Sequence, residues 1–278
     1  MPIIVRRTFH VHPDGSDGNG GRTWADAVLT IAQAQTLATS GRGDRILIAP
    51  SSSSYAVPNI TKDYLSLENA IPGSSYARPD LVTATNGPTI SGQGVVLKGL
   101  RIVGQAGYGL RIQSNGGRLE WCVIEGTTDC IQLLPDNTSA SDALTASEWE
   151  ILHSLIRDGA QGIRFKNPGP AAGLGGVGPT HITAMHNRFL NITNEDVIDE
   201  DTAGSNDKTF YDCVLAHNYH MDRNKAVYVT LTNGGGNRGM VHGYFADDAG
   251  LDSTKIALAS GIVFLGQQAA GMVNGSGF

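Results

Sequence analysis

The chain has 278 residues, of which 36 are glycine and 11 are proline. Each interior glycine weakens a helix by ~1 kcal/mol relative to alanine, so this content argues against a helical bundle. Hydrophobic residues make up 40% and charged residues 17%, which argues against intrinsic disorder. The formal net charge is -6 and no basic patch stands out, so no nucleic-acid partner is expected. No apolar run reaches the length of a membrane-spanning helix, so no membrane partner is expected.

The first elements predicted are a polar loop, a short helix and a strand. Residues 9–21 are rich in glycine, aspartate and asparagine, which is typical of a turn-forming loop. Thr23 and Asp26 are spaced as a capping box, so a helix is predicted over roughly 24–38. Its apolar stripe consists of Trp24, Val28 and Ile31. The apolar run at 45–49 predicts a buried strand.

From residue 95 onward, two kinds of short strand alternate along the chain. Strands of the first kind are predicted at 100–104, 122–126, 154–158, 187–191, 218–222 and 243–247. Strands of the second kind are predicted at 109–113, 130–134, 162–166, 196–200 and 226–230. Apolar positions agree between the copies, whereas the connecting loops differ in length. A chain that repeats such pairs of strands, each of four or five residues, is predicted to form a β-solenoid.

The N-terminal run VHPDGSDGNGGRTWADAVLTIAQAQTLA, followed by GDRILIAP, resembles the cap of right-handed parallel β-helix proteins of the pectin-lyase-like type. The segment HITAMHNRFLNITNEDVIDE resembles their coil repeat. The resemblance covers roughly residues 10–247. It implies an all-β, right-handed parallel β-helix solenoid with a short N-terminal capping helix and a non-repeat C-terminal tail. It implies little about activity, because this fold carries lyases, hydrolases, adhesins and viral structural parts.

Four histidines recur just before the first strand of successive coils. They are His153, His186, His217 and His242. Adjacent coils of a parallel sheet lie ~4.8 Å apart, so we expect the four rings to form a structural ladder. A metal site is the alternative, but it needs side chains that converge on one point. Beside the histidines, Ser154, Asn187 and Asn218 are expected to form a second ladder that satisfies buried backbone groups.

An acidic cluster occupies residues 195–201. The catalytic candidates, if the chain is an enzyme, are Asp199, Glu200, Asp222 and His220. Glycoside hydrolysis needs two carboxyl groups ~5–9.5 Å apart. Asp199 falls in an otherwise apolar column, which indicates either an acid of raised pKa or a one-residue bulge that turns the side chain outward. We favour the bulge, and we expect His220 to pair with an acid of the neighbouring coil.

The loop acids Asp14 and Asp17 are a candidate calcium site. A hydrogen-bonded turn explains the same residues, and we favour it. No metal and no cofactor are therefore expected. The GHG motif of polygalacturonase-like chains and the RxPxxR run of pectate-lyase-like chains are absent, which counts against those two enzyme families.

The chain is expected to have three parts. Residues 1–44 form an N-terminal extension and helical cap, 45–249 form the β-helix coils, and 250–278 form a tail. The tail is apolar and does not fit the repeat, so it is either a cap over the open end of the solenoid or an assembly arm. Its assembly candidates, which could add a strand to a partner, are Ile262, Val263, Phe264 and Leu265.

Two functions remain open. The first is a non-enzymatic structural protein of a bacteriophage virion, most plausibly a capsid decoration (cement) protein that assembles as a homotrimer on a major capsid protein. Three cysteines without framework spacing and an N-terminus without a signal-peptide pattern predict synthesis in the host cytoplasm. The alternative is a carbohydrate-active β-helix, a tailspike-type polysaccharide depolymerase that uses the 195–201 acids and for which a glycan is the partner.

Overall fold

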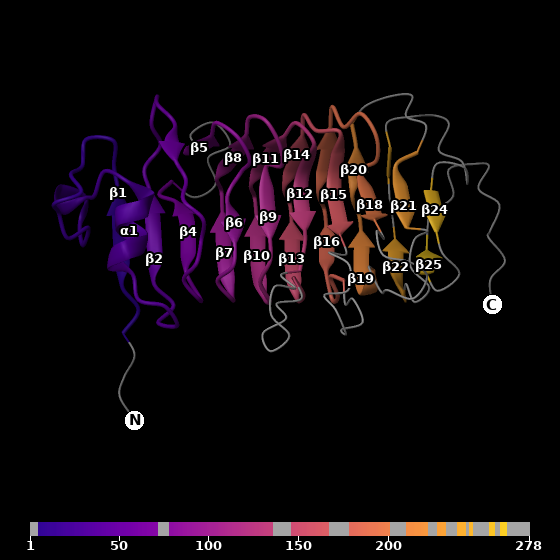
Figure 1. Cartoon of the computed structure of the whole chain (residues 1–278), viewed down its shortest axis with the longest axis horizontal. Coiled ribbons are helices and arrows are strands. Elements are labelled where there is room, and N and C mark those ends of the chain that lie inside the picture. The colour runs from indigo at the N-terminus through magenta and orange to yellow at the C-terminus, as the bar shows by residue number, and fades with distance from the viewer. Residues whose placement is uncertain are drawn as a thin grey trace.

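The computed structural model describes most of the chain. The described residues are 5–71, 78–135, 146–166, 178–200, 210–221, 227–231, 238–242, 245–246, 256–258 and 262–265. In this part the chain winds into successive coils along one long axis, with α1 at the N-terminal end (Figure 1). The strands of the coils assemble into three sheets, and every strand pairing is parallel. The fold is therefore an all-β parallel β-helix, as predicted.

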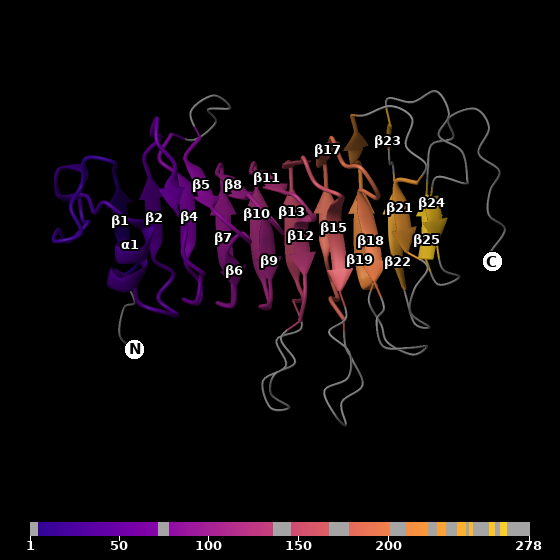
Figure 2. The ribbon, with the colours of Figure 1, turned by 45° about the horizontal axis from the view of Figure 1, so that its top comes forward.

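The largest sheet has ten strands in strict chain order. Its strands are β1 (Thr8–Val11), β2 (Arg45–Ile48), β4 (Ser66–Asn69), β7 (Val95–Lys98), β10 (Gly117–Glu120), β13 (Trp149–Leu152), β16 (Thr183–Met185), β19 (Tyr211–Ala216), β22 (Arg238–His242) and β25 (Ile262–Leu265). The sheet spans the described part of the chain from one end to the other, as the row of arrows in Figure 2 shows. The repeat found in the sequence did not include this sheet.

The other two sheets contain the strands that the repeat predicted. The eight-stranded sheet consists of β3 (Tyr55–Ala56), β5 (Asp80–Thr83), β8 (Arg101–Gly104), β11 (Val123–Gly126), β14 (Leu155–Arg157), β17 (Arg188–Leu190), β20 (Tyr219–His220) and β23 (Phe245–Ala246). The seven-stranded sheet consists of β6 (Thr89–Ile90), β9 (Leu110–Ile112), β12 (Asp129–Leu133), β15 (Gln161–Lys166), β18 (Val197–Glu200), β21 (Val229–Leu231) and β24 (Ile256–Leu258). Each coil thus contributes one strand to each sheet.

The core lies between the three sheets and is built from stacked equivalents. In the eight-stranded sheet, register places Ile102, Ile124, Ile156, Phe189 and His220 above one another, all fully buried. Because side chains alternate across a strand, the neighbours of these residues face solvent. Each coil therefore buries its apolar side chains against the same positions of the coils on either side.

The chain turns two of its corners with left-handed backbone. The corner before the ten-stranded sheet is formed by Gly43, Tyr64, Gly94, Gly116, Glu148, His181 and Asp212, all with positive φ. The corner after it is formed by Gly99, Trp121, His153, His186 and His217, also with positive φ. Residues other than glycine adopt this conformation at some cost. Their repetition places their side chains in two columns on the outside of the solenoid.

The predicted N-terminal helix differs from the observed one. Residues Trp24–Asp26 form a single 3-10 turn, η1, which the Thr23 side chain caps by accepting from the Asp26 backbone N–H. The chain then extends, and Val28 bridges to Val11. The α-helix α1 covers only Ile31–Leu37, with Thr30 as its N-cap. Pairing with the first strand of the sheet thus replaces the first half of the predicted helix.

The boundaries expected at 44/45 and 249/250 do not coincide with the ends of the sheets. Strand β1 precedes residue 45 and pairs with β2 over four residues. At the other end, β24 pairs with β21, and β25 pairs with β22. Residues 256–258 and 262–265 therefore continue the repeat. The expectation of a non-repeat tail is corrected for these two segments, and the rest of 250–278 lies outside the described residues.

Candidate functional site

The predicted histidine ladder is a column of stacked rings headed by a tryptophan. The indole of Trp121 stacks on His153 with ring centroids 4.5 Å apart. His153 stacks on His186 at 5.0 Å, and His186 on His217 at 5.1 Å, with ring planes within 9° of parallel. We call Trp121, His153, His186 and His217 the ring column. It exists because the same left-handed corner recurs one coil further along the axis.

His242 ends the ring column without continuing the stack. Strand register pairs His242 with Ala216 rather than with His217, so it stands one position earlier in its coil. Its ring meets His217 at 4.8 Å with an interplanar angle of 88°. The histidines therefore form the expected ladder through His217, and His242 packs edge-on against its last ring.

A ladder of polar side chains runs beside the ring column inside the corner. Asn187 accepts from the Ser154 backbone N–H at 3.0 Å and donates through Nδ2 to the Ile151 carbonyl at 2.8 Å. Asn218 repeats this arrangement one coil later, accepting from the Asn187 N–H and donating to the Ala184 carbonyl. All of these groups are buried, so the ladder satisfies backbone atoms that water cannot reach.

A groove follows the ring column along the outer face of the eight-stranded sheet. Its volume is about 800 Å³, and residues from six successive coils line it. The side chains that we use below are Arg78, Asp80, Arg101, Trp121, Val123, Leu155, Arg157, Arg188, Leu190, Tyr219 and Met221. The ring column forms one wall, and the sheet forms the floor. At ~4.8 Å per coil, the groove is about 24 Å long.

The floor of the groove is positively charged. Arg101 donates to both carboxylate oxygens of Glu125 at 2.8 Å and to Asp80 at 2.8 Å. Arg157 donates to the same Glu125 from the next coil, with its Nε at 2.8 Å. Burial alone would raise the pKa of Glu125, but the hydrogen bonds from Arg101 and Arg157 lower it below the usual value. Glu125 is thus a carboxylate shared by two guanidinium groups.

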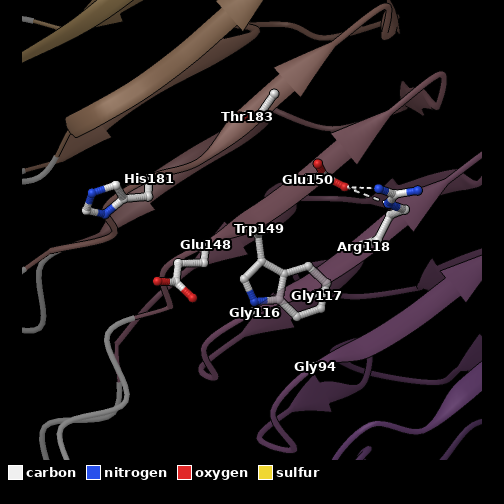
Figure 3. Close-up of a pocket in the computed structure, with 9 residues that line it drawn as sticks. All are labelled: Gly94, Gly116, Gly117, Arg118, Glu148, Trp149, Glu150, His181 and Thr183. Carbon is white, nitrogen blue, oxygen red and sulfur yellow. Dashed lines mark hydrogen bonds and ion pairs between the residues drawn. The ribbon is translucent and has the colours of Figure 1, made fainter. Parts of the chain in front are cut away.

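A second hollow lies on the opposite corner, before the ten-stranded sheet, with a volume of about 480 Å³. Gly94, Gly116 and Gly117 form its floor, because their corner column lacks side chains between Tyr64 and Glu148. Figure 3 shows the Arg118–Glu150 ion pair on one side of the hollow. Trp149 is fully buried, and its indole N–H donates to the Ser114 carbonyl at 2.8 Å. His181, also in the lining, has its Nε2 3.8 Å from Asp212.

The outward side chains of the ten-stranded sheet change from ion-paired to mostly apolar between its N-terminal and C-terminal halves. Its N-terminal half carries the ion pairs Arg45–Glu68, Lys98–Glu120 and Arg118–Glu150. In the C-terminal half, the register positions that follow Glu150 are Thr183, Val214, Met240 and Val263, and the one that follows Leu152 is Met185. Met240 is 36% exposed and Val263 is 56% exposed. We call Leu152, Met185, Val214, Met240 and Val263 the apolar patch.

Of the acidic candidates, the structure describes the side chain of Asp199, which lies in the core and not in the groove. Asp199 is fully buried and pairs in register with Phe165, without a bulge. The favoured prediction, that a bulge turns Asp199 outward, is therefore wrong, because the regular alternation of β18 points its side chain into the core. Glu200 lies in β18, but its side chain is outside the part of the chain that the structure describes, and so is all of Asp222.

His220 pairs with an acid of the neighbouring coil, as expected. Its Nδ1 lies 2.8 Å and 3.0 Å from the two carboxylate oxygens of Asp196, and both residues are fully buried. The Tyr228 ring packs on His220 at 4.5 Å. Because no water or substrate reaches either group, this pair has the character of a core contact that replaces apolar packing.

The N-terminal loop acid Asp17 forms a hydrogen-bonded turn. Its Oδ1 accepts from the backbone N–H groups of Leu29 and Thr30, and its Oδ2 accepts from the Thr30 hydroxyl at 2.9 Å. These contacts fix the chain just before α1. Among the residues that the structure describes, no cluster of histidine, cysteine, aspartate and glutamate has the geometry of a metal site.

The three cysteines are free thiols buried in the core. Burial raises the pKa of Cys122 to about 11 and raises the pKa of Cys130 still further. They pack as small apolar side chains. In the described ranges, no helix is both long and apolar enough to cross a bilayer.

Sequence reasoning missed the groove because its residues belong to different columns. Trp121 replaces a histidine in the ring column, so the histidine pattern did not include it. Arg101, Arg157 and Arg188 occupy outward positions of the predicted strands, where a charged residue is the ordinary choice. Only the three-dimensional register brings them onto one face beside the rings. These groove residues can be found from the sequence by aligning the repeats and comparing their outward positions.

Comparison with known proteins identifies the fold and no family. No family model matches the sequence, and no curated protein matches it. Among solved structures, pectate lyase Pel9A superposes with a TM-score of 0.55 at 10% identity, covering 92% of this chain and 82% of that one. Geobacillus virus E2 ORF18 superposes with a TM-score of 0.51 at 11% identity, covering 84% of this chain and 56% of that one. These likenesses establish the parallel β-helix fold.

Proposed function

We propose that this chain is a non-enzymatic structural protein of a bacteriophage particle, and that it works as a homotrimeric capsid decoration protein bound to a major capsid protein. The observation that carries the proposal is the apolar patch. A regular sheet face whose outward positions change from ion-paired to apolar is suited to contact with another protein. The likeness to a Geobacillus virus E2 protein gives a precedent for this fold in a phage.

The position of the apolar patch favours self-association. Its outermost member, Val263, belongs to the segment Ile262–Leu265, which the sequence marked as an assembly element. In the structure this segment is β25, the last strand of the ten-stranded sheet in the described part of the chain. No other described strand pairs with its outer edge, and Val263 on its outward face is 56% exposed. The side chains of Phe264 and Leu265 lie outside the described residues.

A rigid body suits a protein that reinforces a shell. Side chains are tied from coil to coil by the Arg101–Glu125–Arg157 contacts, by the Asn187–Asn218 ladder and by the ring column. Each tie crosses the boundary between coils, so it resists stretching and bending along the axis. In the described part of the chain, the acids proposed for catalysis are buried within this body.

Light scattering of the purified chain tests the proposal. We expect a mass near three times 29.3 kDa for the full chain and a monomer for Val263→Asp, since a charge in the apolar patch must be desolvated on contact. Val96→Asp is the matched control, because Val96 occupies the same outward column in β7. A monomeric wild type, or a trimer in Val263→Asp, contradicts self-association through this patch. Mass spectrometry of purified particles from the source of the gene then tests the virion assignment.

A polysaccharide depolymerase that uses the 195–201 acids is the second proposal. The observation that favours it is the group of buried ionisable side chains Asp196, Asp199 and His220 in an otherwise apolar core, because such groups often mark functional sites. A cleavage screen against acidic and neutral polysaccharides tests it. Cleavage by the wild-type chain that Asp199→Asn abolishes supports this function. We expect no cleavage by either protein.

A further inference from the structure

The groove beside the ring column has a charge opposite to that of the whole molecule. Arg78, Arg101, Arg157 and Arg188 face Asp80, Glu125 and Asp158 there, so four positive groups against three negative ones give a formal charge of +1. The whole chain carries -6. Arg188 is exposed, and no acidic group among the described residues pairs with it. This concentration of guanidinium groups selects an anionic ligand.

The ring column presents one free face and several ring edges. Trp121 is 49% exposed, and the equivalent corner position of the preceding coil is Gly99, which has no side chain to cover the indole. The faces of His153 and His186 are occupied by their neighbours. Only their edges, which carry nitrogen atoms, are available to a ligand. A ligand therefore meets one aromatic platform and a row of hydrogen-bonding edges.

These features distinguish between two classes of anionic polymer. A single-stranded nucleic acid binds by placing successive bases on free aromatic faces, and here the histidine faces are already occupied. A sugar ring packs its C–H face on one aromatic ring and offers hydroxyl groups to ring edges and guanidinium groups. The apolar floor residues Val123, Leu155 and Leu190 provide further contact for C–H groups. An extended glycan that carries carboxylates fits both the charge and the shape.

We propose that this groove is a non-catalytic binding site for an extended, carboxylate-bearing glycan. Trp121 is the platform for one sugar, and Arg188 binds a carboxylate further along. This site is separate from the apolar patch, so it goes beyond the structural role proposed above and does not depend on it. The two surfaces lie on different sheets of the solenoid.

Isothermal titration of the full chain tests the proposal, with EDTA present to remove divalent cations. The probe is a hyaluronan oligosaccharide, in which every second sugar carries a carboxylate. An uncharged cello-oligosaccharide and the oligonucleotide dT8 are the comparison ligands. We expect saturable binding of the hyaluronan oligosaccharide at pH 7.5, and weaker binding of both comparison ligands.

Two variants and their matched controls locate the site. Trp121→Ala and Arg188→Gln are expected to weaken binding roughly tenfold, in line with the loss of one stacking or charged contact. Their controls are Trp24→Ala, at a tryptophan of similar exposure, and Arg118→Gln on another face.

Several outcomes overturn the inference. No saturable binding of the hyaluronan oligosaccharide removes the site. Unchanged affinity in both Trp121→Ala and Arg188→Gln, with unfolding temperatures like that of the wild type, places any binding elsewhere. Tighter binding of dT8 than of the glycan assigns the groove to nucleic acid. Because Arg188 is exposed, Arg188→Gln remains informative even if Trp121→Ala fails to fold.

Discussion

At the scale of single residues, the solenoid depends on side chains that contact two coils at once. Glu125 accepts from Arg101 of the preceding coil and from Arg157 of the following one. Asn187 contacts the backbone of Ser154 and Ile151 on one side and Asn218 on the other. A substitution at either position removes contacts on both sides of a coil. Both side chains are buried, so no neighbouring surface residue can replace their contacts.

Glu125→Gln is expected to destabilise the chain by about 1–3 kcal/mol at pH 7, because two guanidinium groups lose their shared carboxylate. The pKa of Glu125 lies below its usual value of 4.5. The contribution of the Glu125 carboxylate to stability is therefore complete above the usual pKa and is lost as the pH falls through the folded-state pKa. The difference between wild type and variant should shrink in acid. Urea unfolding at neutral and acidic pH measures this, and Glu150→Gln in an exposed ion pair is the control, with an expected loss within about 1 kcal/mol.

Asn187→Ala is expected to cost about 2–4 kcal/mol, because it leaves the Ser154 N–H and the Ile151 carbonyl buried without the partners they have now. The measurement is the free energy of unfolding in urea. Asn194→Ala, at an exposed residue of the next turn, is the control and should change stability by about 0.5 kcal/mol or less. Equal decreases in the free energy of unfolding of the two variants would show that the polar ladder does not stabilise the chain more than an exposed asparagine does.

At the scale of elements, the sequence predicted two of the three sheets. The strands of the eight- and seven-stranded sheets have aliphatic residues at equivalent inward positions, such as Ile124 and Ile156, so their repeats align. The strands of the ten-stranded sheet also have an aliphatic inward column, which includes Leu97, Leu119, Ile151 and Leu215. The connections that precede several of these strands differ in length, so the repeat drawn from the other two sheets did not reveal this column.

The candidate sites were predicted less completely than the fold. The histidine ladder was visible because one residue type recurs at equivalent positions. The buried position of Asp199 was not visible in the sequence. An acid in an apolar column is explained equally by a bulge and by burial, and the sequence alone does not distinguish the two. The groove required the register of outward residues such as Arg101 and Arg188. Single-residue patterns therefore predict ladders, whereas surfaces need the structure.

The turn around Asp17 gives a prediction about the N-terminal cap. Asp17→Ala is expected to lower stability by about 1–2 kcal/mol, because it removes the acceptor for two backbone N–H groups and for the Thr30 hydroxyl at the start of α1. EDTA should leave the unfolding temperature of the wild type unchanged. A fall in that temperature on adding EDTA, reversed by calcium, would instead assign the loop as a calcium site. Differential scanning calorimetry measures both effects.

At the scale of the whole molecule, each coil contacts only its neighbours, so effects should stay local. Removal of residues 251–278 takes away β24 and β25 and exposes the edges of β21 and β22. We expect the truncated chain to fold, with a lower unfolding temperature, since solenoid stability is close to a sum over neighbouring units. Hydrogen exchange should accelerate in β21 and β22 and stay unchanged in β7 and β10. Acceleration throughout the chain would contradict this local coupling.

The matching registers have a consequence for how the length of such a molecule changes during evolution. Leu155 occupies in its coil the place that Val123 occupies in the preceding one, so deletion of residues 123–154 joins the chain without shifting any side chain to the other face of a sheet. Such a deletion, however, removes Glu125 and places Arg101 and Arg157 two positions apart on neighbouring strands without the carboxylate that they share. Insertions and deletions of whole coils are therefore neutral in geometry but not in charge, and the ion pairs decide at which coils the gene can be lengthened or shortened.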